Sequence, residues 1–113
     1  MNTLICPVKD LDTAKAVWSA LLGVAPSVDE PYYVHFDTPI VQVGLNPNGH
    51  AEGMTGPVAY WTVDDLDATM AAIEDAGGSR HQEPRQVGGG RTVAVMTDAD
   101  GNQIGLMHDR PQA

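Results

Sequence analysis

The feature of this sequence that most limits its fold is an internal repeat. The segment VKDLD (residues 8–12) recurs as VDDLD (residues 63–67), 55 positions further along the chain. A short apolar run precedes each copy, and apolar residues at helical spacing follow each one. A chain that carries one supersecondary pattern twice is expected to fold as two similar modules.

Each copy predicts a strand, a helix and three further strands. Asp10 and Asp65 are predicted N-caps, because a short side-chain oxygen can accept the unpaired amide hydrogens of a first helical turn. Gly23 and the pair Gly77 and Gly78 are predicted to end the helices. Three of the four strands of the first copy are expected at residues 4–6, 33–36 and 40–45, and the four strands of the second at residues 58–61, 79–86, 92–97 and 103–107.

The end of the second copy indicates a local insertion. Residues 43–45 match residues 104–106 at an offset of 61, so six residues are added after the second helix. They are expected around residues 86–90, near three consecutive glycines. This segment is either the connection of a long hairpin or a loop over a ligand.

The length of 113 residues predicts a single domain. Within it we expect module one at 1–46, a linker rich in Gly, Pro and Asn at 47–56, module two at 57–108 and a tail at 109–113. Cys6 is the only cysteine, so a disulfide within the chain is excluded and a reducing compartment is favoured. The N-terminus lacks the features of a signal peptide and no stretch is apolar enough to span a membrane, so we expect a cytoplasmic protein.

The charge balance excludes some partners. Six Lys and Arg face 15 Asp and Glu, for a net charge of −9. Nucleic acid and anionic membrane surfaces need clustered cations, so neither is an expected partner. A neutral or cationic small molecule fits the charge. A homodimer is also expected, because a chain of this size leaves strand edges open.

The repeat and the closing segment DADGNQIGL (residues 98–106) together resemble the vicinal oxygen chelate superfamily, which includes glyoxalases, bleomycin resistance proteins and extradiol dioxygenases. The closing segment is similar to that family's D-P-D-G-N-x-I-E-L signature. The resemblance implies an α+β fold in which two tandem βαβββ modules form curved mixed sheets around a cleft. The alternative fold, a ferredoxin-like dimeric α+β barrel, does not explain the extra strand in each copy.

The resemblance also indicates where metal ligands would lie. Metal-dependent members use a His early in the first strand of each copy and a Glu on the last strand. These positions fall on Thr3, Gly44, Val58 and Gly105, which offer neither an imidazole nor a carboxylate. The sequence therefore predicts a metal-ligand-deficient member with no cofactor, and argues against glyoxalase I and extradiol dioxygenase activity.

Strand alternation predicts which side chains line the cleft. Glycines at the former metal positions would leave space for something bulkier than a metal. Trp18, Trp61 and Cys6 are expected in the core. The residues predicted to bind the ligand are Tyr33, His35, Gln42, Tyr60, Thr62, Gln103 and Met107.

Three functions follow from these observations. The leading hypothesis is a metal-independent small-molecule binding protein of the glyoxalase and bleomycin-resistance type, which sequesters a neutral or cationic, antibiotic-like compound. The second is a metal-independent lyase or isomerase that uses His35, His81 or Tyr60 as acid or base. The third is a non-catalytic protein-interaction module. Whether any reaction is catalysed stays open at this point.

Overall fold

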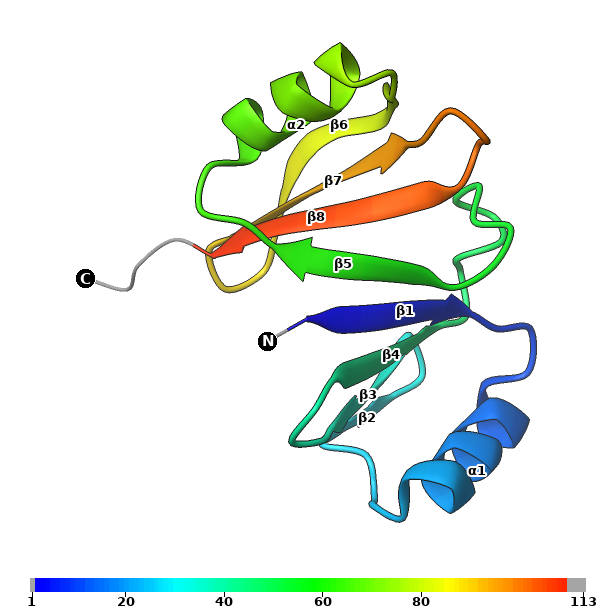
Figure 1. Ribbon diagram of the computed structural model, residues 1–113. Coiled ribbons are helices and arrows are strands. Elements are labelled where there is room, and N and C mark those ends of the chain that lie inside the picture. Colours follow the sequence, from blue (N-terminus) through cyan, green and yellow to red (C-terminus); the bar gives the residue numbers. More distant parts are fainter. Residues whose placement is uncertain (1, 110–113) are drawn as a thin grey trace. The chain divides into compact units, whose positions relative to one another are not determined.

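Each copy of the sequence repeat forms a sheet with one helix packed on it. The computed structural model describes residues 2–109, so residues 110–113 of the predicted tail lie outside the described part (Figure 1). The chain divides into a first unit that ends at Ala59 and a second that begins at Tyr60. Within residues 2–109, two helices and eight strands make an α+β fold, as predicted.

The first unit has the strand order β2-β3-β4-β1. Strands β1 and β4 run parallel, and the other neighbours are antiparallel. The βαβββ pattern predicted a fourth strand in this unit, but the sequence did not locate it at β2. Its three residues are all exposed, and its only neighbour in this order is β3. The elements are β1 (Thr3–Pro7), α1 (Leu11–Leu22), β2 (Val28–Glu30), β3 (Tyr33–Asp37) and β4 (Gln42–Asn46).

Helix α1 begins and ends at the predicted residues. The Asp10 carboxylate accepts hydrogen bonds from the Thr13 backbone amide at 3.2 Å and from the Thr13 hydroxyl at 2.8 Å. These bonds lower the pKa of Asp10, because they favour its charged form. Gly23 caps the C-terminal end in the left-handed conformation, at φ 70°.

The core of the first unit lies between α1 and one face of its sheet. Trp18 is partly buried against this core, as predicted. Burial raises the pKa of the Cys6 thiol, which is only 4% exposed. The buried core residues are Cys6, Val34, Phe36, Val43 and Leu45.

The second unit repeats the pattern with a longer hairpin. Its strand order is β5-β8-β7-β6, with β5 and β8 parallel. The inserted residues extend the β6–β7 hairpin, which closes in a turn at residues 88–90, so the hairpin alternative is confirmed. The elements are β5 (Val58–Thr62), α2 (Leu66–Asp75), β6 (Ser79–Val87), β7 (Arg91–Thr97) and β8 (Gln103–Asp109).

The core of the second unit lies between α2 and its sheet. Asp65 caps α2 by accepting a hydrogen bond from the Ala68 amide at 3.0 Å, as predicted. Trp61 lies opposite Leu106 in the strand register but is 51% exposed, so its assignment to the core was wrong. Alternation gives the side of a strand, whereas burial also requires an element that covers it. The core residues are Leu66, Met70, Ala94, Met96 and Leu106.

The β7–β8 connection is a turn organised by one carboxylate. Asp98 accepts hydrogen bonds from the backbone amides of Asp100 and Asn102, both at 2.9 Å, and from the Asn102 side chain at 3.0 Å. These bonds lower the pKa of Asp98.

Within residues 2–109, neither helix is long and apolar enough to cross a membrane.

Candidate functional site

The sheet face of the first unit that lies opposite its core carries a row of polar side chains. On β3, Val34 and Phe36 are buried in the core, so alternation places Tyr33, His35 and Asp37 on the other face. The register then sets Asp37 beside Gln42 and His35 beside Gly44 on β4, and Gln42 beside Thr3 on β1. We call Thr3, Tyr33, His35, Asp37 and Gln42 the polar row.

Short contacts join the polar row from end to end. The Tyr33 hydroxyl lies 2.9 Å from His35 Nδ1. His35 Nε2 lies 3.3 Å from Asp37 Oδ1. Asp37 Oδ1 also accepts a hydrogen bond from Gln42 Nε2 at 3.1 Å, and Gln42 Oε1 accepts one from the Thr3 hydroxyl at 3.2 Å.

The chemistry of each group sets the direction of these bonds. A carboxylate beside Nε2 favours the His35 tautomer with its hydrogen on that nitrogen. Nδ1 then carries a lone pair and accepts the Tyr33 hydroxyl hydrogen. The His35 side chain is 15% exposed and that of Asp37 is 57% exposed, so the imidazole is more covered than the carboxylate beside it.

Gly44 allows the Tyr33 hydroxyl to lie against the sheet. A Cβ atom at position 44 would overlap the Tyr33 hydroxyl, and would lie 2.8 Å from Tyr33 Cζ and 2.7 Å from Ile5 Cδ1. The space above this glycine is therefore taken by a tyrosine of the same unit. This corrects the expectation that the glycine leaves space for a bulky ligand.

In the second unit a different tyrosine, Tyr60, covers the corresponding glycine, Gly105. Tyr60 pairs with Gly105 between β5 and β8. A Cβ atom at position 105 would lie 2.5 to 2.8 Å from three ring atoms of Tyr60, so the ring lies directly on the glycine. Thr62 and Met107 are paired on the same face, and Thr62 is exposed whereas Met107 is 1% exposed.

The structure brings the predicted ligand residues together within each unit. Tyr33, His35 and Gln42 belong to one connected row in the first unit. The register places the other four on one face of the second unit, namely Tyr60, Thr62, Gln103 and Met107. There Gln103 Nε2 lies 3.2 Å from His81 Nε2.

Sequence reasoning missed two members of the polar row. Asp37 falls between the strands predicted at 33–36 and 40–45, and Thr3 was considered only as a position that the resemblance assigns to a metal ligand. The alternation of Tyr33, His35 and Asp37 at every second residue is a signal that could have identified Asp37. Thr3 could be found only from the parallel pairing of β1 with β4.

The four positions that the resemblance assigns to metal ligands do not fit a metal. The Thr3 hydroxyl is engaged with Gln42, Val58 is 2% exposed, and tyrosines cover the two glycines. Among residues 2–109, no three His, Cys, Asp or Glu side chains lie close enough together to hold a metal ion.

The remaining histidines have separate environments. His50 is exposed in the segment between β4 and β5. His81 is exposed on β6. His108 lies within β8, one residue beyond the strand predicted at 103–107, and its Nδ1 is 2.9 Å from the Val63 carbonyl oxygen. A carbonyl oxygen only accepts, so His108 carries its hydrogen on Nδ1.

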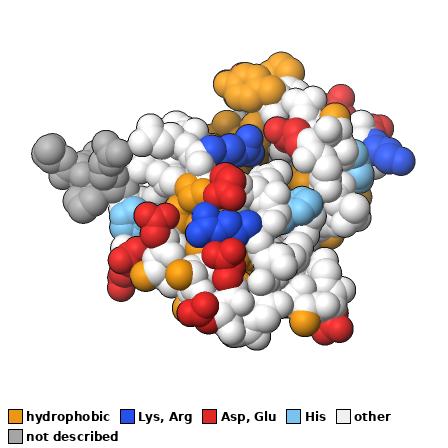
Figure 2. Space-filling model, turned by 90° about the horizontal axis from the view of Figure 1, so that it is seen from above, with side chains coloured by type: hydrophobic (Ala, Val, Ile, Leu, Met, Phe, Trp, Pro, Cys, Tyr) orange, Lys and Arg blue, Asp and Glu red, His pale blue; other side chains and the backbone are white. Residues whose placement is uncertain are grey.

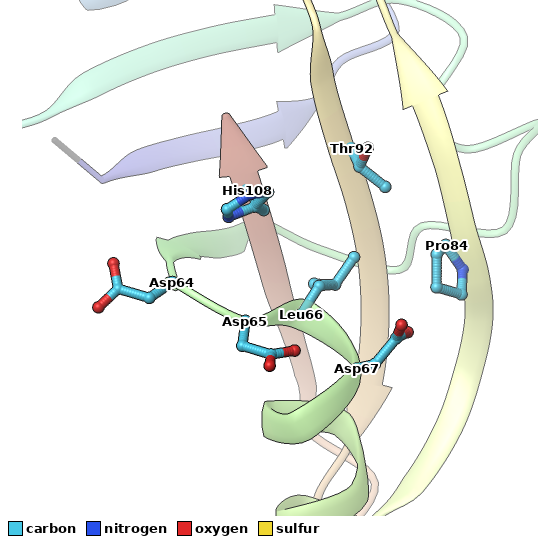
Figure 3. A pocket seen from close by; sticks show the side chains of 7 residues that line it. All are labelled: Asp64, Asp65, Leu66, Asp67, Pro84, Thr92 and His108. Carbon is cyan, nitrogen blue, oxygen red and sulfur yellow. The ribbon is translucent and has the colours of Figure 1, made fainter. Parts of the chain in front are cut away.

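A hollow of about 330 Å³ lies in the second unit, beside the start of α2. Figure 3 shows Leu66, Thr92 and Pro84 around it, with the Asp64 carboxylate pointing away from them. None of the predicted ligand residues lines it. Its walls are formed by Asp64, Asp65, Leu66, Asp67, Pro84, Thr92 and His108.

Ion pairs engage several of the few basic side chains. Arg80 lies between Glu74 and Glu83, Arg91 pairs with Asp109 at 2.7 Å, and Lys15 pairs with Asp29 at 3.1 Å. Figure 2 shows basic side chains with acidic ones beside them on the face in view. Because Arg80, Arg91 and Lys15 each pair with an acidic side chain, these three residues do not form a basic patch.

Comparisons with known proteins agree on the fold. A family model described as the Glyoxalase/Bleomycin resistance protein/Dioxygenase superfamily matches residues 1–106. No curated protein matches the sequence. Many solved structures do match.

Three of these structures illustrate the likeness. An NAD-dependent benzaldehyde dehydrogenase from Legionella pneumophila is 19% identical, with a TM-score of 0.76 over 97% of this chain and 100% of that one. A glyoxalase/bleomycin resistance protein/dioxygenase superfamily member from Vibrio splendidus 12B01 is 14% identical, with a TM-score of 0.72 over 96% and 98%. A methylmalonyl-CoA epimerase from Mycobacterium tuberculosis is 20% identical, with a TM-score of 0.65 over 96% and 87%. At these identities the likeness shows the fold alone.

Proposed function

The chain belongs to the glyoxalase/bleomycin resistance protein/dioxygenase superfamily, and we propose that it binds a neutral or cationic small molecule without a metal ion. The observation that carries this proposal is the polar row of the first unit. It presents a phenol, an imidazole, a carboxylate and an amide on the sheet face opposite the core, next to Gly44, a position that the resemblance assigns to a metal ligand.

The composition of the polar row supports the ligand class. A binding site for an organic molecule needs a few polar groups that fix orientation on a largely preformed surface. Asp37 gives the row a negative charge, and the contacts that join its five members involve no Lys or Arg. The net charge of −9 favours the same class of ligand, because it attracts cations and repels anions.

A metal-free mode of binding is supported by the two covered glycines. A carboxylate at position 44 or 105 would collide with Tyr33 or Tyr60. The tyrosines therefore supply the polar and aromatic surface at the positions where metal-dependent relatives place a ligand atom. Sequestration requires affinity alone, so this function needs no reaction.

The proposal is tested by thermal unfolding against a panel of neutral, cationic and anionic aromatic compounds, in buffer with EDTA. A ligand present at 100 times its Kd stabilises the folded state by about 2.7 kcal/mol. We expect neutral or cationic compounds to raise the Tm with EDTA present. The proposal is wrong if no compound raises the Tm, or if stabilisation appears only when a divalent metal is added.

Two tyrosine variants then locate the binding site. Tyr33→Phe removes one hydroxyl from the polar row, whereas Tyr32→Phe removes one from the adjacent residue, which is 66% exposed. Loss of one hydrogen bond to a ligand costs about 0.5–1.5 kcal/mol, or a roughly 2- to 12-fold higher Kd. We expect that weakening for Tyr33→Phe only, measured by titration calorimetry.

A second candidate function, acid–base catalysis, is favoured by the contact between Tyr33 and His35. The sequence offers His35, His81 and Tyr60 for this role. His35 is favoured because its Nδ1 lies within hydrogen-bonding distance of a phenol, which can give up its proton.

A further inference from the structure

We propose that Tyr33 is the proton-transferring group of this site, with His35 as its proton acceptor and Asp37 as the group that positions and balances His35. The ligand would be a neutral small molecule that carries a weakly acidic proton. This inference rests on the proposed function for its ligand, but the activation of Tyr33 is a property of the protein alone.

The geometry provides a path for the phenol proton. The Tyr33 hydroxyl and His35 Nδ1 are 2.9 Å apart, and the two ring centroids are 5.8 Å apart. Transfer of the hydroxyl hydrogen to Nδ1 leaves a phenolate and an imidazolium. The imidazolium forms 3.3 Å from the Asp37 carboxylate, whose charge stabilises it. An adjacent base of this kind activates a hydroxyl group.

The neighbours of Asp37 hold this arrangement in place. Gln42 donates a hydrogen bond to the same Asp37 oxygen that faces His35, at 3.1 Å. Gln42 is oriented in turn by Thr3, which is 3% exposed and lies in β1. Because the amide oxygen of Gln42 accepts from Thr3, its NH2 group is directed toward Asp37. Asp37 and Gln42 are therefore positioning residues, whereas His35 contacts the reacting hydroxyl directly.

The reaction step is balanced without an oxidant or reductant. The Tyr33 phenolate oxygen takes the acidic proton from the ligand. The covalent bond between the ligand and that hydrogen breaks, and an O–H bond forms on Tyr33. The ligand keeps the electron pair as its conjugate base. The proton that left Tyr33 stays on His35 until it returns to the ligand or passes to water.

The test uses an aryl sulfonyl fluoride that carries an ammonium group, with peptide mass spectrometry to locate the adduct. An activated phenol attacks the sulfur, the S–O bond forms, fluoride leaves with the S–F pair, and the phenol proton passes to His35 and then to solvent. Tyr32 is an internal reference, because it is 66% exposed and is the preceding residue in the chain.

We expect Tyr33 to react at least about 10-fold faster than Tyr32, which is a modest effect for a positioned base. His35→Gln and Asp37→Asn should each slow labelling of Tyr33 at least about 10-fold by the same argument, and leave the rate at Tyr32 unchanged. Circular dichroism checks the fold of both variants, and the exposed position of Asp37 makes Asp37→Asn the milder change.

The inference is overturned if Tyr33 reacts no faster than Tyr32 in the folded wild-type protein, or if neither variant slows it. Protection of Tyr33 by a compound that raises the Tm supports binding beside the phenol. Fast labelling of Tyr33 without protection by any stabilising compound contradicts the proposed location of the binding site, while the activation of Tyr33 stands.

Discussion

The contact between Tyr60 and Gly105 can be tested by adding a single methyl group. In Gly105→Ala the new Cβ would lie 2.5, 2.6 and 2.8 Å from three ring atoms of Tyr60. Carbon atoms in van der Waals contact are about 3.5–4.0 Å apart, so the ring must move by roughly 1 Å. Overpacking of this kind destabilises the folded state by about 1–3 kcal/mol.

A second glycine isolates that effect. A Cβ atom added at Gly88 would meet no other atom within 4 Å, and Gly88 does not adopt a left-handed φ. Gly88→Ala is therefore expected to be neutral or to stabilise by up to about 1 kcal/mol, through the unfolded chain. Gly105→Ala and Gly88→Ala share this effect on the unfolded chain. The difference between them should equal the overpacking penalty of about 1–3 kcal/mol, or roughly 4–12 °C in Tm.

Urea unfolding of the wild type, Gly105→Ala, Tyr60→Ala and the double variant completes the test. Gly105→Ala is measured in the wild type and in a Tyr60→Ala background, where the added methyl group no longer meets a ring. We expect its penalty to fall by at least about 1 kcal/mol in that background. The reasoning is refuted if Gly105→Ala behaves like Gly88→Ala, or if its penalty is the same with and without the Tyr60 ring.

Three further outcomes are expected. The bonds from Asn102 and the turn amides lower the pKa of Asp98 in the folded protein, so the ionised Asp98 stabilises the fold fully above about pH 4 and this stabilisation is lost as the pH falls through the folded pKa. Asp98→Asn should therefore flatten the decline of the urea midpoint between about pH 5 and 2, and a decline equal to that of the wild type would contradict this. Asp65→Ala should destabilise by about 1 kcal/mol through loss of the α2 cap, while Asp64→Ala, one residue before the cap, should change the urea midpoint little; equal effects would count against the cap assignment. Phe36→Ala, at a fully buried position, should destabilise by about 3–5 kcal/mol, whereas Val17→Ala, at a position 59% exposed, should stay within about 0.5 kcal/mol by thermal unfolding; a small loss for Phe36→Ala would contradict the first-unit core.

Local signals in the sequence were sufficient for most elements of the fold. The carboxylates of Asp10 and Asp65 cap the helices because capping depends on residues only three positions apart. The position of strand β2 could not be predicted because its three exposed residues show no alternation that distinguishes a strand from a loop. Trp61 was misassigned because its exposure depends on what lies over β5, which alternation does not encode.

The candidate site was predictable only in part for a related reason. Alternation along β3 placed Tyr33 and His35 on one face. The link from Asp37 to Gln42 and Thr3 depends on the pairing of β3 with β4 and of β4 with β1, which joins residues up to 39 positions apart. The location of each tyrosine over a glycine depends on side-chain direction between strands, so the sequence alone did not reveal it.

The covered glycines also bear on how such a protein can diverge in evolution. A single Gly105→Glu change would place a carboxylate under the Tyr60 ring, where even a methyl group does not fit, and the same conflict holds for Gly44 beneath Tyr33. A change to a metal-binding state therefore requires the tyrosine to be lost before or together with the gain of the acid. Because Thr3 and Val58 stand at the positions that the resemblance assigns to histidines, each module would need at least three changes, namely loss of the tyrosine, gain of the acid and gain of the histidine.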